Sequence, residues 1–337
     1  MVIASLLTMA LQAAAAQPAP LRSFGDWIVG CDNGRACQAV ALITYADEAD
    51  RVTMTLRREA EGGAEPVIWI NHGDARGGAL EADGQRLAAR LIEAADAIIV
   101  HPADTIAVVD AVRAARRLRL LDASGNSLGE ISVSGASAAM LYMDEQQRRL
   151  DNVGALVRRG TRPASAVPPP PPLPEVRLAP ASTEAPASIG EAQIAALRRE
   201  SGCTLDEVGG PDIYEAVPLE PAKTLVLLAC GSGAYNVTYI PYLAQGTGAQ
   251  MRFAAATFDG QSAMEEPGRP SLTNAEWDTE RRLLSEFPRG RGLGDCGTKS
   301  SYGWDGRRFR LVERQEMDQC QGAVDFITTW RARVIRP

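Results

Sequence analysis

The segments GRGLGDCG (290–297), WDG (304–306), CQG (320–322) and WRAR (330–333) bring two cysteines, two tryptophans and several glycines into the last fifth of the chain. Glycine permits the tight turns that join neighbouring strands, and a disulfide can close such a structure. This part of the sequence therefore predicts a small β-structure closed by a disulfide. It contains no recognisable set of catalytic residues.

Length and composition indicate a folded protein of two domains. The 337 residues are enough for two separate cores, and 45% hydrophobic with 23% charged residues is typical of globular proteins. The net charge is −7, without a basic cluster that would attract a phosphate backbone. Nucleic acid is therefore a poor partner for this chain.

The first sixteen residues predict export. An apolar run from Met1 to Leu11 is followed by Ala14-Ala15-Ala16, the small-residue pattern that signal peptidase accepts. No Lys or Arg precedes the run, so either the true start lies upstream or the amino terminus supplies the positive charge. A buried N-terminal helix is the alternative. We expect no transmembrane segment and a periplasmic or secreted protein.

Export affects how the cysteines are interpreted, because oxidising compartments favour disulfides. An even set of six allows fifteen connectivities, which sequence alone does not distinguish. Their grouping favours pairing in sequential order. Metal is the alternative, but there is no C-x-x-C and both histidines are far from any cysteine in sequence, so we expect no metal site and no cofactor. The six residues are Cys31, Cys37, Cys203, Cys230, Cys296 and Cys320.

Strand patterns dominate the first half. Residues 24–31 and 37–45 predict two strands around a turn at 32–34, and further strand patterns occur at 51–57, 67–70 and 97–100. Helices are expected from Asp104 and from Ser137 to about Leu150. The adjacent Asp144 and Glu145 diverge on that second helix and cannot form an acid/base pair, so both are expected to be solvated.

The composition changes at residues 161–190, where an unbroken proline run covers 168–172. Such a segment has little apolar area and stays extended, so it predicts a spacer. A short helix at 192–200 and several strands follow. We therefore expect an α+β fold of mostly antiparallel strands with a few packed helices. The predicted parts are a signal peptide (1–16), an N-terminal α+β domain (17–160), a Pro/Ala-rich linker (161–190) and a C-terminal β-rich domain (191–337).

Candidate site residues are few. There is no G-x-S-x-G motif, and His72 and His101 are better explained as turn residues than as bases. Four residues near the C-terminal turns are candidates for binding: Trp304 and Asp305, and Arg289 and Arg291, which flank Gly290 and could hold an anion. Asp295 and Asp305 are expected to cap backbone amides.

Tryptophans offer a second candidate surface in a chain with only 5% aromatic residues. Most are expected to anchor the core near disulfides, whereas an exposed subset could bind a sugar or a peptide. The residues considered are Trp27, Trp277, Trp304 and Trp330.

The chain resembles a family of exported proteobacterial proteins known only as a domain of unknown function. The resemblance covers nearly all of the mature chain and is most specific in SGASAAMLYMDEQ (134–146) and in the C-terminal segments quoted above. The first half, with FGDWIVGC (24–31), is also similar to the invasion-associated locus B proteins. The second resemblance implies a secreted or periplasmic envelope protein and supplies no catalytic residues, and the first family comes without an assigned activity. We expect a non-enzymatic protein that binds an envelope protein or glycan. The alternatives are an envelope-glycan-acting enzyme and an inhibitor of a cell-wall lytic enzyme.

Overall fold

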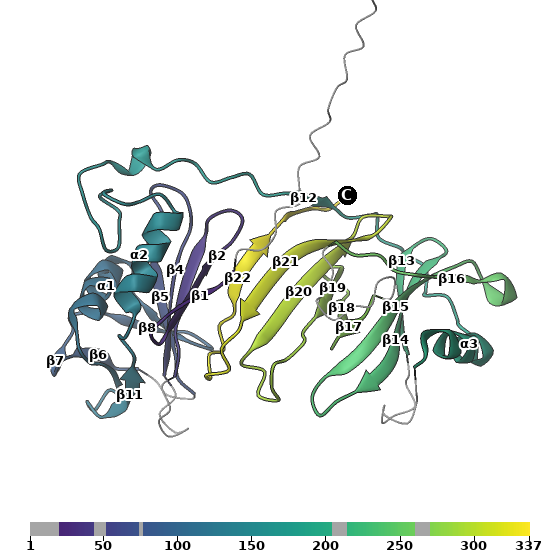
Figure 1. Ribbon diagram of the computed structural model, residues 1–337, viewed down its shortest axis with the longest axis horizontal. Helices are drawn as coiled ribbons and strands as arrows, with labels where there is room; N and C mark the ends of the chain where they lie inside the picture. Colours follow the sequence, from purple (N-terminus) through teal and green to yellow (C-terminus); the bar gives the residue numbers. More distant parts are fainter. Residues whose placement is uncertain (1–19, 44–51, 74–76, 204–213, 260–269) are drawn as a thin grey trace, which may run out of the picture.

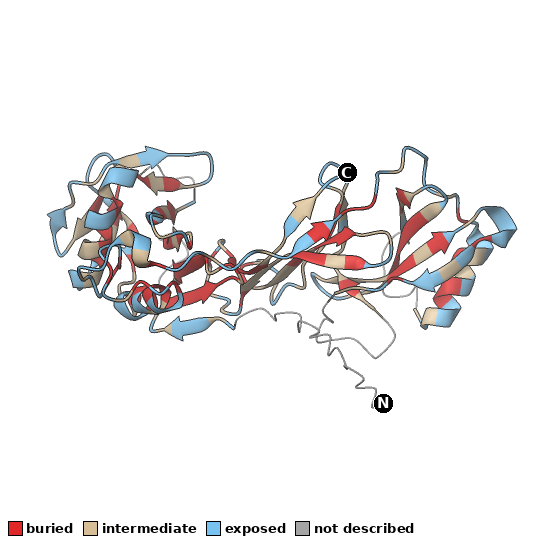
Figure 2. Cartoon of the chain, turned by 90° about the horizontal axis from the view of Figure 1, so that it is seen from above, coloured by how far each residue is buried: buried red, intermediate tan, exposed pale blue. Residues whose placement is uncertain are grey.

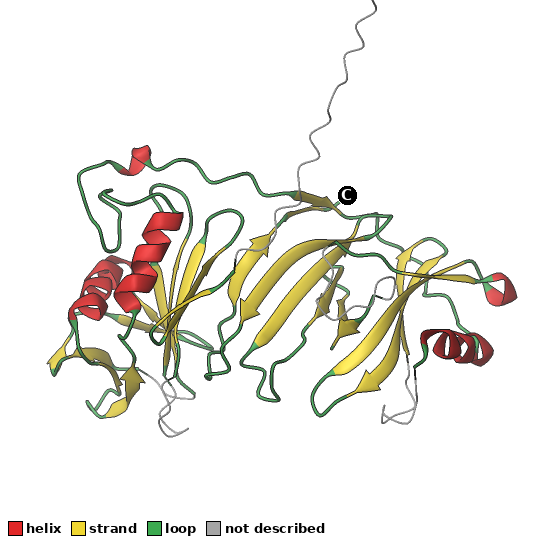
Figure 3. Ribbon diagram, in the orientation of Figure 1, coloured by secondary structure: helices red, strands yellow, loops and turns green. Residues whose placement is uncertain are grey.

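The computed structural model describes residues 20–43, 52–73, 77–203, 214–259 and 270–337. The molecule is elongated, with a helix-covered sheet at one end and two further sheets toward the other (Figure 1). Strands dominate the described part (Figure 3), which contains the α-helices α1 (Thr105–Ala114), α2 (Ala136–Gln146) and α3 (Glu191–Ser201). The prediction of mostly antiparallel strands with few helices is confirmed. The expected signal peptide lies outside the described residues.

The first sheet has seven strands in the order β1-β2-β3-β4-β5-β9-β8, and each neighbouring pair is antiparallel. The predicted hairpin forms between β2 and β3, where Asp32 Oδ1 accepts hydrogen bonds from Gly34 N at 2.8 Å and from Ala36 N at 2.9 Å. The strands are β1 (Arg22–Phe24), β2 (Trp27–Cys31), β3 (Cys37–Ala41), β4 (Thr53–Arg58), β5 (Val67–Asn71), β8 (Leu91–Glu93) and β9 (Ile98–Val100).

Both faces of this sheet are covered, so every residue of β2 and β3 is buried. Successive side chains of a strand point to opposite faces. Trp27 and Val29 belong to the core that includes residues of α1 and α2, whereas Ile28 packs with Phe326 and Ile327 of the C-terminal half. Figure 2 shows buried residues in both halves and in the strands where they meet. The first sheet is thus part of the contact between the two halves.

A smaller sheet and two helices complete the N-terminal half. The sheet has the order β11-β10-β6-β7, with β6 (Ala79–Ala82), β7 (Gln85–Arg86), β10 (Leu118–Leu121) and β11 (Ser127–Ile131). Asp104 is the N-cap residue of α1, as predicted, and Val108 and Val112 are buried on its inner face. Helix α2 ends four residues earlier than the predicted Leu150.

The expectation of a solvated Asp144 is wrong. Its side chain is fully buried, and its Oδ1 lies 2.7 Å from Arg58 Nη2 on β4. The same carboxylate accepts hydrogen bonds from Leu156 N and Val157 N, both at 2.9 Å. These amides satisfy the remaining acceptor capacity of the buried charge. Local helical pattern missed this role because the cationic partner is 86 residues away in the chain.

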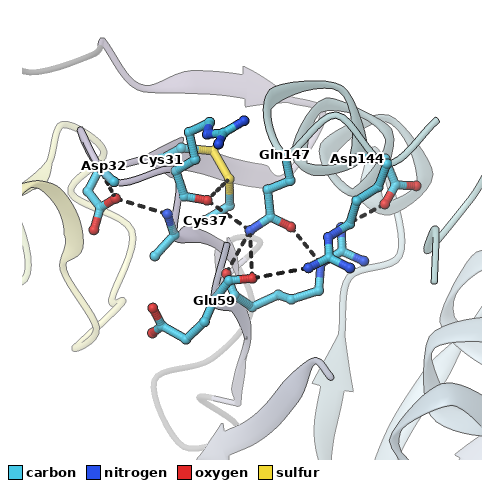
Figure 4. The surroundings of a disulfide bond; sticks show 11 residues. Cys31, Asp32, Cys37, Glu59, Asp144 and Gln147 are labelled. Atoms are coloured by element: carbon cyan, nitrogen blue, oxygen red, sulfur yellow. Dashed lines mark hydrogen bonds and ion pairs between the residues drawn. A yellow bond between two sulfur atoms is a disulfide. The ribbon is translucent and has the colours of Figure 1, made fainter. Parts of the chain in front are cut away.

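The same network reaches the first disulfide (Figure 4). Gln147, just after α2, accepts a hydrogen bond from Arg58 Nε at 2.6 Å and donates to the carbonyl of Arg35 at 2.9 Å. Arg35 lies between Cys31 and Cys37, which form the disulfide that joins β2 to β3. The buried polar residues therefore tie the end of α2 to the hairpin.

The C-terminal half contains two sheets, β13-β14-β15-β16 with β17 paired to β15, and β18-β19-β20-β21-β22. Leu225 and Leu227 of the former pack with Tyr302 and Phe309 of the latter in one core. The strands are β13 (Tyr214–Glu220), β14 (Lys223–Ser232), β15 (Val237–Gln245), β16 (Arg252–Ala255), β17 (Leu272–Thr273), β18 (Glu276–Asp278), β19 (Leu283–Glu286), β20 (Gly297–Trp304), β21 (Phe309–Met317) and β22 (Ile327–Arg331).

The second part of the proline-rich stretch packs into the C-terminal core. After the proline run, β12 (Glu175–Arg177) pairs in parallel with β23 (Arg333–Ile335). Val176 and Leu178 are buried in a cluster with Leu283 and Val312. We expected the whole of 161–190 to be a spacer. The few apolar residues after the prolines find a partner sheet, and the sequence pattern of that stretch alone did not reveal it.

Three disulfides join Cys31 to Cys37, Cys203 to Cys230 and Cys296 to Cys320, so the predicted sequential pairing is confirmed. Within the described ranges, no helix is long and apolar enough to cross a membrane.

Candidate functional site

A pocket of about 310 Å³ lies in the C-terminal half, where β13, at the edge of its sheet, approaches the β18–β19 hairpin and the end of β20. Residues that follow the proline run complete its wall. Its volume is at the lower end of the range of about 300–1,000 Å³ that is usual for ligand pockets. The lining residues are Ala181, Ser182, Pro186, Glu215, Ala216, Val217, Pro218, Leu219, Trp277, Thr279, Arg282 and Trp304.

Trp304 is held rigidly at this pocket. The side chain is 4% exposed, and its indole N–H donates a 2.6 Å hydrogen bond to Glu220 Oε1. Lys223 Nζ lies 3.1 Å from Glu220 Oε2 and 5.1 Å from the centre of the Trp304 ring. The charges of Glu220 and Lys223 therefore offset each other, and the tryptophan ring cannot rotate without losing its hydrogen bond.

Trp277 is different, because part of its ring remains accessible. It belongs to β18 and packs only partly against the core, whereas Trp27, Trp304 and Trp330 are buried. Its indole N–H makes no hydrogen bond with any residue that the structure describes. Trp277 therefore offers the pocket an apolar ring and a free donor.

A carboxylate of a second sheet acts on the carboxylate that lines the pocket. Burial and the charge of Glu276 on β18 together raise the pKa of Glu215 on β13 above its usual value. Neither carboxylate forms an ion pair within the described part of the chain. Arg282 also lines the pocket, and its guanidinium donates a hydrogen bond to the carbonyl of Ala179. The pocket therefore combines aromatic surface with a carboxylate and a guanidinium that form no ion pair with each other in the described chain.

The four binding candidates from the sequence do not form one site. Trp304 lies at one end of β20, whereas an isolated bridge pairs Arg289 with Gly297 at the other end. A strand of that length spans roughly 23 Å. Asp305 Oδ1 accepts hydrogen bonds from the amides of Arg307 and Arg308, both at 2.9 Å, as expected for a capped turn. Burial alone would raise the pKa of Asp305, but these amides lower it below its usual value.

At the opposite end, Arg291 is paired with a carboxylate. Its Nε lies 2.7 Å from Asp295 Oδ1, and Asp295 Oδ2 also accepts a 2.7 Å hydrogen bond from Gly322 N. The hydrogen bond from Arg291 holds the pKa of Asp295 below its usual value. The guanidinium of Arg289 lies 5.5 Å from the ring of Phe287. Arg291 is therefore already paired with Asp295, and this weakens the interpretation of Arg289 and Arg291 as an anion site.

His101 is a turn residue, as predicted, because its Nδ1 accepts a hydrogen bond from Ala103 N at 3.3 Å. The Nδ1 atom of His72 is buried without a hydrogen-bond partner in the described chain. Among the described residues, no three His, Cys, Asp or Glu side chains gather as a metal site would require.

Sequence reasoning missed Glu215, Glu276 and Arg282 at the pocket, since nothing in their local sequence distinguishes them from other surface residues. The sequence offers Trp277 only as one of several tryptophans, because the residues around it do not show how much of its ring is exposed.

Comparisons with known proteins show the family. Residues 21–333 match the model of the family described as "Protein of unknown function (DUF1176)". The chain is also similar to the protein named "Uncharacterized protein YpfG" of Escherichia coli (strain K12), with 28% identity over 343 residues that cover 93% of each chain. No solved structure matches. The family match covers nearly the whole described fold, including both halves and all three disulfides, and this chain therefore belongs to the DUF1176 family.

Proposed function

We propose that this protein is an exported, non-enzymatic binding protein of the cell envelope, and that its C-terminal pocket takes a sugar ring of an envelope glycan. Two features support export: the apolar run that ends at Ala14-Ala15-Ala16, and three disulfides, which persist in oxidising compartments. The similarity of the first half to invasion-associated locus B proteins agrees with an envelope location.

The observation that carries the glycan proposal is the partly exposed Trp277 in a ring-sized pocket. The apolar face of a sugar packs on an aromatic ring, while its hydroxyl groups need donors and acceptors at the edge. The free indole N–H of Trp277, the guanidinium of Arg282 and the carboxylate of Glu215 supply these groups. The fixed ring of Trp304 closes the other side of the pocket.

Binding is favoured over hydrolysis because, among the residues that the structure describes, Glu215 is the only carboxylate in the pocket lining. Glycosidases place two carboxyl groups on either side of the scissile bond. Glu215 lines the cavity, whereas Glu276, the other carboxylate near it, is not part of the lining. A glycan-acting enzyme is therefore the weaker alternative.

The experiment is titration calorimetry of the full mature chain with tetra-N-acetylchitotetraose and with its deacetylated form, the glucosamine tetramer. Trp277→Ala should weaken the binding of whichever tetramer the native chain binds by roughly tenfold. Trp277→Phe keeps an aromatic ring, although a smaller one, and removes the indole N–H, so it retains most of the packing while it tests the ligand contact. Tyr235→Ala is the control, because Tyr235 is 39% exposed and lies outside the pocket. Binding of neither tetramer, or equal binding by Trp277→Ala and the native chain, would refute the proposal.

A second candidate function, inhibition of a cell-wall lytic enzyme, is favoured by the opposite end of the last sheet. The loops at residues 287–296 and 318–326 are joined by the disulfide between Cys296 and Cys320. Leu293 and Val324 on these loops are 63% and 61% exposed. A braced loop with an apolar tip is the shape that can enter an active-site cleft.

Inhibition is tested by measuring peptidoglycan turnover by lysozymes and lytic transglycosylases in the presence of the protein. Leu293→Asp should abolish inhibition, whereas Leu141→Asp, at a 37% exposed position on α2, should not affect it. An absence of inhibition at micromolar protein would exclude this candidate.

A further inference from the structure

The carboxylate of Glu215 lines the C-terminal pocket, and Glu276 directly precedes the lining residue Trp277 in the chain. Glu215 and Glu276 come from the edge strands of two different sheets, and the charge of Glu276 acts on Glu215. In the part of the chain that the structure describes, neither has an ion pair. Two neighbouring like charges without a counter-ion repel each other.

The chain supplies cations to other carboxylates nearby. Lys223 neutralises Glu220 at 3.1 Å, and Arg310 lies 3.4 Å from Asp305 through its Nη1 atom. Arg282 is the cation that lines the pocket, yet its guanidinium is directed to the carbonyl of Ala179. No ion pair joins Arg282 to Glu215 or Glu276 in the described part of the chain. A positively charged ligand group would offset both.

The neighbouring residues show how such a group would be held. Lys223 Nζ lies between the carboxylate of Glu220 and the face of Trp304, at 3.1 Å from the oxygen and 5.1 Å from the ring centre. An ammonium group gains from both contacts, because a carboxylate provides charge and an aromatic face provides a favourable quadrupole. Glu215 and Trp277 present the same two chemical groups, a carboxylate and an indole ring, to the pocket. No lysine is among the described residues that line it.

We propose that the ligand of this pocket carries a protonated primary amine, as a glucosamine unit does, with the ammonium group at Glu215, where the charge of Glu276 also attracts it, and the sugar ring against Trp277. This inference rests on the proposed glycan-binding function and defines its ligand more closely. N-acetylation removes the charge of the amine, so the pocket distinguishes a deacetylated envelope glycan from an acetylated one.

The test compares the glucosamine tetramer with tetra-N-acetylchitotetraose by titration calorimetry, at a pH where the amines are protonated. The native chain should bind the amine form roughly tenfold more tightly, because a charge-assisted contact is lost on acetylation. Glu215→Gln and Glu276→Gln should each weaken binding of the amine form several-fold more than binding of the acetylated form, because glutamine keeps an oxygen acceptor and loses only the charge. Added salt should weaken only the amine form, since part of the attraction is screened.

Glu280→Gln is the matched control. It removes the same charge in the turn of the same hairpin, at an exposed residue outside the pocket lining, and should change neither affinity. Equal affinity for both tetramers, or unchanged binding of the amine form in Glu215→Gln, would overturn the amine proposal while a loss in Trp277→Ala still supports glycan binding. Binding of neither tetramer would overturn both proposals.

Discussion

Asn33 and Arg331 are 298 residues apart in the chain and exchange two hydrogen bonds. Asn33 Nδ2 donates to the carbonyl of Arg331 at 2.9 Å, and Arg331 N donates to Asn33 Oδ1 at 2.7 Å. The guanidinium of Arg331 also pairs with Asp32 and lies 3.3 Å from Glu59. A turn of the first sheet thus satisfies the backbone of β22, at the outer edge of the last one. The two halves of the molecule are joined by directed bonds as well as by apolar contact.

Replacing Asn33 by Ala removes both of these bonds and leaves the backbone groups of Arg331 without their partner. Unfolding in urea should show a loss of about 1–3 kcal/mol in stability. Asn126→Ala is the control, since Asn126 bonds within an exposed turn, and it should change stability by less than about 0.5 kcal/mol. Equal effects of the two variants would show that the contact adds nothing to stability.

The buried pair of Arg58 and Asp144 predicts a large effect from one lost charge. Asp144→Asn leaves the buried guanidinium without its counter-ion, which should cost about 3–5 kcal/mol. Glu145→Gln changes the next residue of the same helix, which is exposed, and should have almost no effect. Similar denaturation midpoints for these two variants would contradict the assigned role of Asp144.

Leu178 tests whether the end of the proline-rich stretch contributes to the C-terminal core. The side chain is 5% exposed and packs close to Gly303 of β20. Leu178→Ala should lower the free energy of unfolding by about 2–5 kcal/mol, because it leaves a cavity. The control is Leu293→Ala at a 63% exposed position. If Leu178→Ala is as stable as the control, this stretch behaves as a spacer throughout.

The raised pKa of Glu215 makes a prediction about pH. In Glu276→Gln the pKa of Glu215, followed by NMR of the side-chain carboxyl, should fall toward its ordinary value because the repelling charge is gone. A raised pKa means that the folded protein binds this proton more tightly than the unfolded chain does. The ionised carboxylate therefore opposes folding at neutral pH, and this opposition disappears as pH falls through the raised pKa. An unchanged pKa of Glu215 in this variant would show that the charge of Glu276 does not affect the ionisation of Glu215.

Local patterns succeeded where a neighbour in sequence decides the structure. The helix after Asp104 follows from its apolar face, and the hairpin at residues 32–34 follows from its turn residues. The six cysteines pair in chain order, as their grouping suggested.

Patterns failed where the deciding partner is far away in sequence. Asp144 has the helical position of a solvated residue, and only β4 brings Arg58 to it. Trp277 and Trp304 are indistinguishable as letters in a sequence, yet one is buried and the other partly open, because they lie on different strands of the last sheet.

The sequence by itself determined the β-rich class and the predicted helices, because these depend on turn chemistry and side-chain periodicity, and the grouping of its cysteines favoured the disulfide pairing that the structure shows. Only the tertiary structure decided that Asn33 forms hydrogen bonds with Arg331, that Leu178 is buried and that the charge of Glu276 acts on Glu215. These relationships depend on which sheets lie against each other. Sheet order is set by the total burial and hydrogen bonding of strands that are distant in the sequence. A local segment therefore does not show which strands will become its neighbours.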